Sequence, residues 1–297
     1  IELGGKRLKR TRVTELELES AQLSYIIKKH AILEEARSVF IDILFAQHIL
    51  NLKKETVSVV EQFLQSVKTR VEAGRLSPAE AARAQIALTS QQVELYRIQR
   101  NLKNHWRLLA SFWGSNSPDF SKADENLDSM IVLPSEEYIQ LNIMESPSIL
   151  EKNIDIQIQQ AIIDVEQANR IPDLQMSAGI KKTDVPGNTY QVGLSIPLQV
   201  FNRNQGTIQA SIAQMDQLSE EKRALEINLR TQIAHLYSDL LILGKEVEAL
   251  KTTILPEAHK AYQIINDGYL QGKFVFLDVV DAQTTLYEAE ENYWLAM

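Results

Sequence analysis

Two aspartates, Asp278 and Asp281, follow a glycine and a run of bulky apolar residues in GKFVFLDVVDAQ, positions 272–283. Residues three apart lie on the same face of a helix, so the sequence predicts two neighbouring carboxylates near the start of a helix. Such a pair suits two kinds of chemistry. Crowded carboxylates attract cations and resist full ionisation, whereas acids close to a helix N-terminus cap the helix and complement its dipole.

The same outline occurs 198 residues earlier, in GRLSPAEAARAQ at positions 74–85. Gly74 is a natural residue to end one helix, Ser77 can cap the next, and Pro78 is a favoured first helical residue. The segment therefore predicts a tight connection between two antiparallel helices.

Two pairs of segments indicate an internal repeat. IELGGKR at 1–7 aligns with IPLQVFN at 196–202, and GRLSPAEAARAQIAL at 74–88 aligns with GKFVFLDVVDAQTTL at 272–286. We infer two structural copies of one unit, each made of a strand end, a long helix, a glycine turn and a returning helix. The sequence begins inside the strand pattern and stops inside a helical one, so we expect both ends to be cuts through a longer protein.

Long helices must carry these turns. Residues 6–72 contain neither glycine nor proline, and apolar residues recur there at helical spacing. One helix of that length spans about 100 Å and indicates a coiled coil or a helical barrel, not a compact globule. The other expected helices cover 78–113, 135–144, 147–170, a long stretch from residue 207 towards Gly268 with a kink at Pro256, and the chain from Phe276 onwards.

The period of the apolar residues changes to two between residues 172 and 200. PDLQMSAGIKK and TYQVGLSIPLQV, joined by the turn DVPGN, alternate apolar residues with small or polar ones, which predicts a β-hairpin. Strands of about 9–11 residues with an apolar outer face suit a transmembrane barrel, and the half-buried strands of a soluble sheet suit the pattern equally. In the barrel interpretation, the residues expected to face lipid are Leu174, Met176, Ala178, Ile180, Tyr190, Val192, Leu194 and Ile196.

Composition excludes several classes of function. The net charge of −8 and the lack of a basic stripe with interleaved aromatics argue against nucleic-acid binding. The chain has no cysteine and its five histidines are scattered, so we expect neither a metal site nor a cofactor. The sequence contains no phosphate loop, nucleophile elbow or dinucleotide fingerprint, and we do not expect an enzyme. It also lacks the run of 18 apolar residues that a transmembrane helix requires.

Taken together, these segments resemble those of the TolC-type outer membrane factors, the channel components of tripartite efflux pumps and type I secretion. The resemblance is greatest to the heavy-metal efflux branch of CzcC- and CusC-like proteins. Beyond the aligned pairs above, it is carried by RVEAGRLSPAEAARAQ, RIPDLQMSAGIKK, VGLSIPLQVFNRNQG, ILPEAHKAY and GYLQGKFVFLDVVDAQTTL.

The resemblance implies a mainly α fold with a small β part. In such proteins three protomers form one assembly, in which long antiparallel helical hairpins build a periplasmic α-barrel and each protomer adds four strands to a twelve-stranded transmembrane β-barrel. The organisation implied for this chain is a strand tail at 1–5, a first helical hairpin at 6–113, a linker with short equatorial helices at 114–170, a transmembrane hairpin at 171–200 and a second helical hairpin at 201–297 with its tip at 268–281.

The resemblance also implies a gate. Both glycine turns would lie at the periplasmic tip, where three copies of Asp278 and Asp281 surround a common axis and form the constriction. Tyr269 corresponds to a tyrosine that helps to hold the tip closed, with its partner position at Glu80. Phe274, with Lys273 beside it, stands where some members carry an arginine, so that specific closing salt bridge is not an expectation for this chain.

The outer side of the tip would contact a periplasmic adaptor protein through packed helices. Ordinary turn chemistry explains Gly74 and Ser77 without any partner. Further partners implied are an inner-membrane RND-type transporter and outer-membrane lipid. The residues expected to touch the adaptor are Gly74, Arg75, Leu76, Ser77, Gly272, Lys273, Phe274 and Val275.

The function implied is a passive exit duct in the outer membrane of a Gram-negative bacterium, with most of the chain in the periplasm. It would release heavy-metal cations or small toxic compounds. The alternative is a soluble, elongated coiled-coil scaffold that conducts nothing. The scaffold predicts that Leu174, Met176, Val192 and Leu194 are buried against another part of the chain, whereas the duct predicts that they are exposed.

Overall fold

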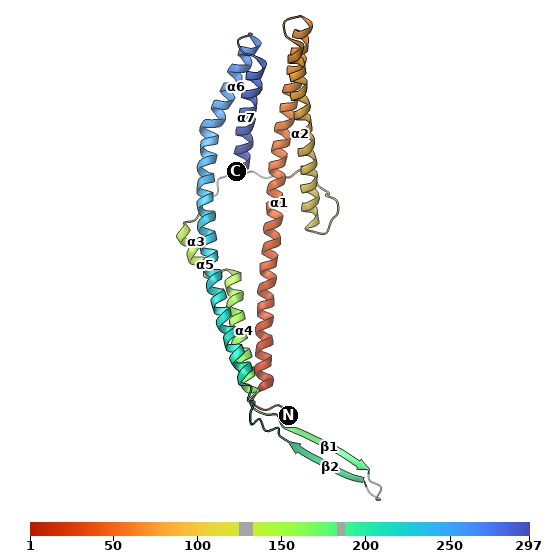
Figure 1. Ribbon diagram of the computed structural model, residues 1–297, viewed down its shortest axis with the longest axis vertical. Helices are drawn as coiled ribbons and strands as arrows, with labels where there is room; N and C mark the ends of the chain where they lie inside the picture. Colours follow the sequence, from red (N-terminus) through yellow and green to blue (C-terminus); the bar gives the residue numbers. More distant parts are fainter. Residues whose placement is uncertain (125–132, 183–187) are drawn as a thin grey trace. The chain divides into compact units, whose positions relative to one another are not determined.

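The computed structural model describes residues 1–124, 133–182 and 188–297, and they are mainly helical with one two-stranded sheet (Figure 1). The chain divides into two compact units. Unit 1 comprises residues 1–30 and 134–235, and unit 2 comprises residues 31–133 and 236–297. Within the described ranges, no helix combines the length and the apolar character that crossing a membrane requires.

Two long helices contribute to both units. Helix α1 (Lys6–Glu72) has 67 residues and α5 (Gln205–Ala249) has 45. The bounds of α1 coincide with the stretch that lacks glycine and proline, because every residue there can donate and accept the helical hydrogen bonds. The prediction of one helix of about 100 Å is confirmed.

In unit 1 three short segments pack beside the long helices: α3 (Glu136–Asn142), the 3₁₀ helix η1 (Ile143–Glu145) and α4 (Pro147–Ala168). Helix α4 hydrogen-bonds to both long helices. Lys9 of α1 donates to the Asp164 carbonyl at 3.0 Å, and Gln159 donates to the Ser211 carbonyl of α5, also at 3.0 Å. These contacts hold α1, α4 and α5 together within the unit.

The hairpin of unit 1 consists of β1 (Gln175–Lys182) and β2 (Asn188–Ser195), paired antiparallel. Met176 lies opposite Leu194, and Ile180 lies opposite Tyr190, so the apolar side chains share one face. The large ones within the strands are between 63% and 77% exposed, which contradicts the burial that the scaffold hypothesis predicts for Met176, Val192 and Leu194. Leu174, directly before β1, is partly buried, so neither the full exposure nor the full burial expected of it is observed. Residues 183–187, which include most of the predicted turn DVPGN, lie outside the described residues.

The first residues of the chain pair with the base of this hairpin. The nitrogen of Ile1 donates to the Leu174 carbonyl at 2.6 Å, and the Leu174 N–H donates back to the Ile1 carbonyl at 3.1 Å. Lys6 is 7% exposed, and its Nζ lies 2.6 Å from Oδ1 of Asp173. This ion pair fixes the start of α1 beside the start of β1.

Unit 2 contains the remainder of α1, α2 (Pro78–Ser111), α6 (Leu255–Leu270) and α7 (Phe276–Ala296). Helix α5 continues into α6 through a π-helical turn, Leu250–Ile254. There the N–H of Leu255 donates to the Leu250 carbonyl, five residues back. Pro256 has no N–H to donate, and the expected interruption takes the form of this wider turn directly before it.

A shared apolar cluster joins α1, α2, α6 and α7 close to the two glycine turns, and we call it the four-helix cluster. Its buried members are Val60, Phe63, Leu64, Val67, Ala84, Leu88, Tyr269 and Val279. It buries apolar surface between the two helical hairpins near the turns and so holds them together there.

Part of the segment expected to be a polar linker is packed against helices. Phe120 lies 4.9 Å from the ring of Trp106, and Ala123 is 7% exposed. The side-chain amide of Gln47 both donates to and accepts from the backbone of Ala123, at 3.0 and 3.1 Å. Residues up to 124 therefore belong to the core of unit 2, and residues 125–132 lie outside the described residues.

Candidate functional site

The two glycine turns of unit 2 share the same backbone hydrogen bonds. In each, the glycine N–H donates to the carbonyl three residues back at 2.9 Å, and the next N–H donates to the carbonyl five residues back at 2.8 Å. Gly74 and Gly272 have φ of +70° and +76°. This is the Schellman ending of a helix, which favours glycine because it alone adopts positive φ without a steric penalty.

The helices that leave the two turns are capped in different ways. At the start of α2 the Ser77 hydroxyl accepts the N–H of Ala79 at 3.3 Å. At the start of α7 the equivalent residue is Val275, whose side chain cannot accept a hydrogen bond. The Asp278 carboxylate instead accepts the N–H of Val275 at 2.9 Å. Asp278 therefore stabilises the first turn of α7, as one of the two kinds of chemistry predicted.

Asp281 lies one turn further along α7 and is exposed, whereas Asp278 is partly buried. The spacing places both aspartates on neighbouring positions of one helix face, close to the Gly272 turn. One carboxylate thus has a structural contact within the chain, and the other remains accessible to ions or partners.

Tyr269 joins α6 to α1 through its ring. The ring centroid lies 4.8 Å from that of Phe63, and the guanidinium carbon of Arg70 lies 4.7 Å from it. Only 4% of Tyr269 is exposed, and its hydroxyl is buried with no hydrogen-bond partner among the described residues. Aromatic and cation–π contacts, each worth about 1 kcal/mol, therefore hold the ring in the four-helix cluster.

Glu80, the expected partner position of Tyr269, pairs with Arg83 on its own helix at 3.2 Å. The sequence analysis did not predict Phe63 and Arg70 as site residues. They lie seven residues apart, which places them on one face of α1, but apolar residues recur along the whole helix and give no signal for the pair.

Phe274 packs inside the α6–α7 connection. A β-carbon at Gly268 would lie 2.3 Å from Cδ2 of Phe274, so the glycine provides the space for the ring. Seven of the eight turn residues expected to meet an adaptor are exposed. The other, Leu76, is partly buried against the four-helix cluster.

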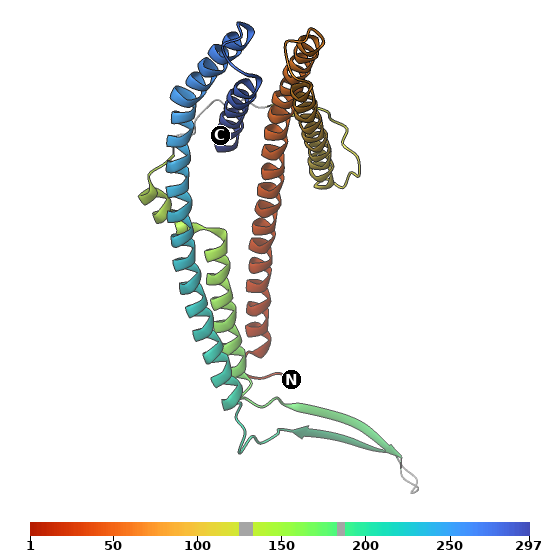
Figure 2. The ribbon, with the colours of Figure 1, turned by 45° about the horizontal axis from the view of Figure 1, so that its top comes forward.

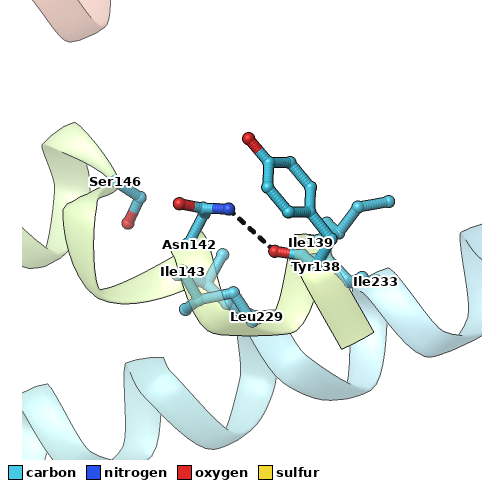
Figure 3. Close-up of a pocket in the computed structure, with 7 residues that line it drawn as sticks. All are labelled: Tyr138, Ile139, Asn142, Ile143, Ser146, Leu229 and Ile233. Atoms are coloured by element: carbon cyan, nitrogen blue, oxygen red, sulfur yellow. Dashed lines mark hydrogen bonds between the residues drawn. The ribbon is translucent and has the colours of Figure 1, made fainter. Parts of the chain in front are cut away.

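Unit 1 contains a separate, mostly apolar cavity of about 420 Å³ between α3, η1 and α5 (Figure 3). The Ser146 hydroxyl oxygen is buried there without a partner among the described residues, and the Asn142 amide donates to the Tyr138 carbonyl at 2.8 Å. Among the described residues no charged side chain lines the cavity, and the sequence analysis did not predict it. Its lining residues are Tyr138, Ile139, Asn142, Ile143, Ser146, Leu229 and Ile233.

Away from the turns, α6 and α7 share an acid–imidazole contact. Nε2 of His259 lies 3.3 Å from Oε1 of Glu290. Burial raises the pKa of Glu290, the imidazole lowers it, and the carboxylate of Glu55 on α1 raises it. Over the described parts of the chain, no three histidine, aspartate or glutamate side chains gather closely enough to hold a metal ion.

The sequence is similar to those of two metal-resistance proteins over most of its length. It is 32% identical to the cobalt-zinc-cadmium resistance protein CzcC of Cupriavidus metallidurans over 99% of the chain and 70% of CzcC. It is 23% identical to the nickel and cobalt resistance protein CnrC of the same species, over 78% of the chain and 56% of CnrC.

Solved structures share the fold. A CusC crystal structure superposes on 99% of this chain, and the match covers 71% of the CusC chain, with a TM-score of 0.84 at 15% identity. The outer membrane protein VceC of Vibrio cholerae matches 100% of this chain and 73% of its own, with a TM-score of 0.79 at 15% identity. The outer membrane efflux protein family matches residues 1–115 and 138–297. The chain therefore belongs to the outer membrane efflux protein family.

Proposed function

We propose that this chain forms the passive exit duct of a tripartite efflux system, as a homotrimer in the outer membrane with most of the chain in the periplasm. The observation that carries the proposal is the exposed apolar face of the hairpin β1–β2 in a chain of this family. Large apolar side chains that alternate along two paired strands suit contact with lipid, since water makes such exposure unfavourable.

The proposed assembly uses two copies of one structural unit in each protomer, four strands per protomer in a shared barrel, and helical hairpins that line a tunnel. The matching hydrogen bonds of the Gly74 and Gly272 turns support the duplication. The reciprocal pairing of Ile1 with Leu174 supports a further strand beside β1, antiparallel to it.

In this proposal the tip of the tunnel is an acidic gate. Three copies each of Asp278 and Asp281 surround the axis, and Tyr269 and Glu80 belong to the contacts that keep the two hairpins together. The packing of Tyr269 on Phe63 of α1 supports the role of its ring. Carboxylates crowded around a narrow opening attract cations and repel anions.

The substrates proposed are heavy-metal cations or small toxic compounds. The names of CzcC and CnrC refer to cobalt, zinc, cadmium and nickel resistance, and the acidic tip suits divalent cations. The energy would come from an RND-type transporter in the inner membrane. An adaptor protein would dock on the exposed turn residues around Gly74 and Gly272 and open the gate.

The test is ion selectivity in planar bilayers with the full chain. Replacing Asp278→Asn and Asp281→Asn together removes the charges but keeps an oxygen that can accept the N–H of Val275. We expect weaker preference for cations and weaker block by divalent cations. Unchanged selectivity and conductance would contradict the acidic gate.

A matched control separates charge from helix capping. Asp278→Ala removes the cap as well as the charge and should cost about 1 kcal/mol of stability, which Asp278→Asn should not. Both single variants should change selectivity by the same amount, because they remove the same charge. A selectivity change confined to Asp278→Ala would indicate a capping role only.

A further inference from the structure

One acid of unit 2 lies in the packed seam between helices, well away from the glycine turns. Glu290 belongs to α7, and its carboxylate contacts His259 of α6. Helix α6 runs beside α7 (Figures 1 and 2). The Glu290 side chain is 24% exposed and lies 3.3 Å from the imidazole of His259, which is 56% exposed. A carboxyl in this position gives up part of its hydration when α7 packs, which disfavours its charged form.

Two charged groups from different helices act on Glu290. His259 on α6 lowers its pKa through charge and a hydrogen bond, while Glu55 on α1 raises it through repulsion. Burial is the largest influence and also raises the pKa. These are the titratable neighbours that act on it from α6 and α1 in the described part of the chain. The pKa of Glu290 therefore depends on how closely α7 packs against α6 and α1.

Other residues of α7 near Glu290 contact α1 and the end of α5 directly. One turn along α7, the ring of Trp294 stacks on His48 of α1, with centroids 3.7 Å apart and planes inclined by 13°. Tyr293 is buried with Val247 and Leu250 beside the π-helical turn. A change of charge at Glu290 therefore occurs inside a seam in which α7 already touches α1 and the end of α5.

We propose that Glu290 is a pH-sensitive contact: when it takes up a proton, α7 packs more tightly against α6 and α1. A neutral carboxyl costs less to bury and does not repel Glu55. An imidazolium at His259 acts in the opposite direction, because it stabilises the carboxylate.

The direction of the pH dependence follows from linkage. A group whose pKa is raised on packing contributes stability that is complete below its unfolded pKa, and that is lost as the pH rises through the folded value. For Glu290 the seam should thus be tightest in acid and loosen towards neutral pH. This inference does not depend on the proposed channel activity.

The experiment is hydrogen–deuterium exchange of α7 in the full chain in detergent, followed by mass spectrometry between pH 4.5 and 8.5. After correction for the chemical pH dependence of exchange, protection of α7 should rise as the pH falls, in one transition. Glu290→Gln, a neutral side chain of the same shape, should keep protection high throughout and abolish the transition. Glu291→Gln is the matched control. Glu291 is the exposed neighbour of Glu290, so its replacement should leave the transition in place.

Two further variants test the assigned neighbours with opposite signs. His259→Gln removes the group that stabilises the carboxylate, so the midpoint of the transition should move to higher pH. Glu55→Gln removes the repulsion, so the midpoint should move to lower pH. A transition that persists in Glu290→Gln would overturn the proposal. So would midpoints that move in the same direction, or a uniform loss of protection without any movement of the midpoint, since these indicate a purely structural role.

Discussion

At the scale of single residues, Tyr269 is held by its ring and not by its hydroxyl. Phe63 and Arg70 of α1 contact the ring, and the buried hydroxyl has no partner among the described residues. A buried hydroxyl without a hydrogen bond lowers stability, because it has lost its contacts with water. The ring and the hydroxyl should therefore make opposite contributions to the packing of α6 on α1.

Two substitutions separate these contributions. Tyr269→Phe keeps the ring and removes the unpartnered oxygen, so the stability of the chain should stay within about 1 kcal/mol or increase. Tyr269→Ala removes the ring from the four-helix cluster and should cost about 3–5 kcal/mol. Thermal unfolding of the purified chain in detergent measures both. A large loss in Tyr269→Phe would show that the hydroxyl has a partner in the assembly, for which Glu80 is the candidate.

At the scale of elements, the two helix-ending turns are built alike. Each has a glycine with positive φ, and a β-carbon at either glycine would meet open space. A side chain there would be disfavoured by the backbone conformation alone, not by a clash. The two turns should therefore respond in the same way to the same substitution.

Gly74→Ala and Gly272→Ala should each reduce stability by about 1–2 kcal/mol, because alanine is strained in the left-handed conformation. Gly206→Ala is the matched control. Gly206 lies within α5 without positive φ, and its β-carbon would also meet open space, so alanine should be neutral or stabilising by up to about 1 kcal/mol. Unfolding midpoints decide the matter: equal effects at all three positions would contradict the role of the turn conformation.

The local elements could be read from sequence, since their signals are local. The absence of glycine and proline between residues 6 and 72 sets the bounds of α1, and the alternation around Met176 and Val192 sets the register of the hairpin. The contacts between distant segments could not be read in this way. Nothing in the sequence near Tyr269 indicates that Phe63, over 200 residues earlier, contacts its ring.

The packing of residues up to 124 in the expected linker could not be predicted either, because it too depends on contacts with distant segments. Phe120 and Ala123 occur among polar residues, and their fixed positions follow from contacts with distant residues: Phe120 packs on Trp106, and Gln47 bonds the backbone of Ala123. The π-helical turn was also hidden, because proline predicts an interruption of the helix but not its form.

At the scale of the whole molecule, the hairpin has the surface that most clearly requires an environment other than water. Its two faces differ: Val192 belongs to the exposed apolar face, and Gln191 belongs to the opposite face, across from Gly179. Neighbouring residues of one strand therefore allow the same charge to be placed on either face.

Val192→Arg should prevent stable insertion of the full chain into outer membranes, since an arginine facing lipid near the bilayer midplane costs about 2–4 kcal/mol. Gln191→Arg should be inserted normally. The yield of detergent-extracted trimer from the outer-membrane fraction is the measurement. Equal yields of the two variants would contradict contact of this face with lipid.

The π-helical turn before Pro256 has a consequence for the direction in which α6 faces. Such a turn holds one residue more than an α-helical turn, so the side chains beyond it are rotated by about 100° relative to an unbroken helix. Deleting one residue between 250 and 254 would remove that rotation. His259 and Tyr269 would then point more than a quarter-turn away from Glu290 and Phe63, so one additional residue in this turn determines which side chains α6 can contact.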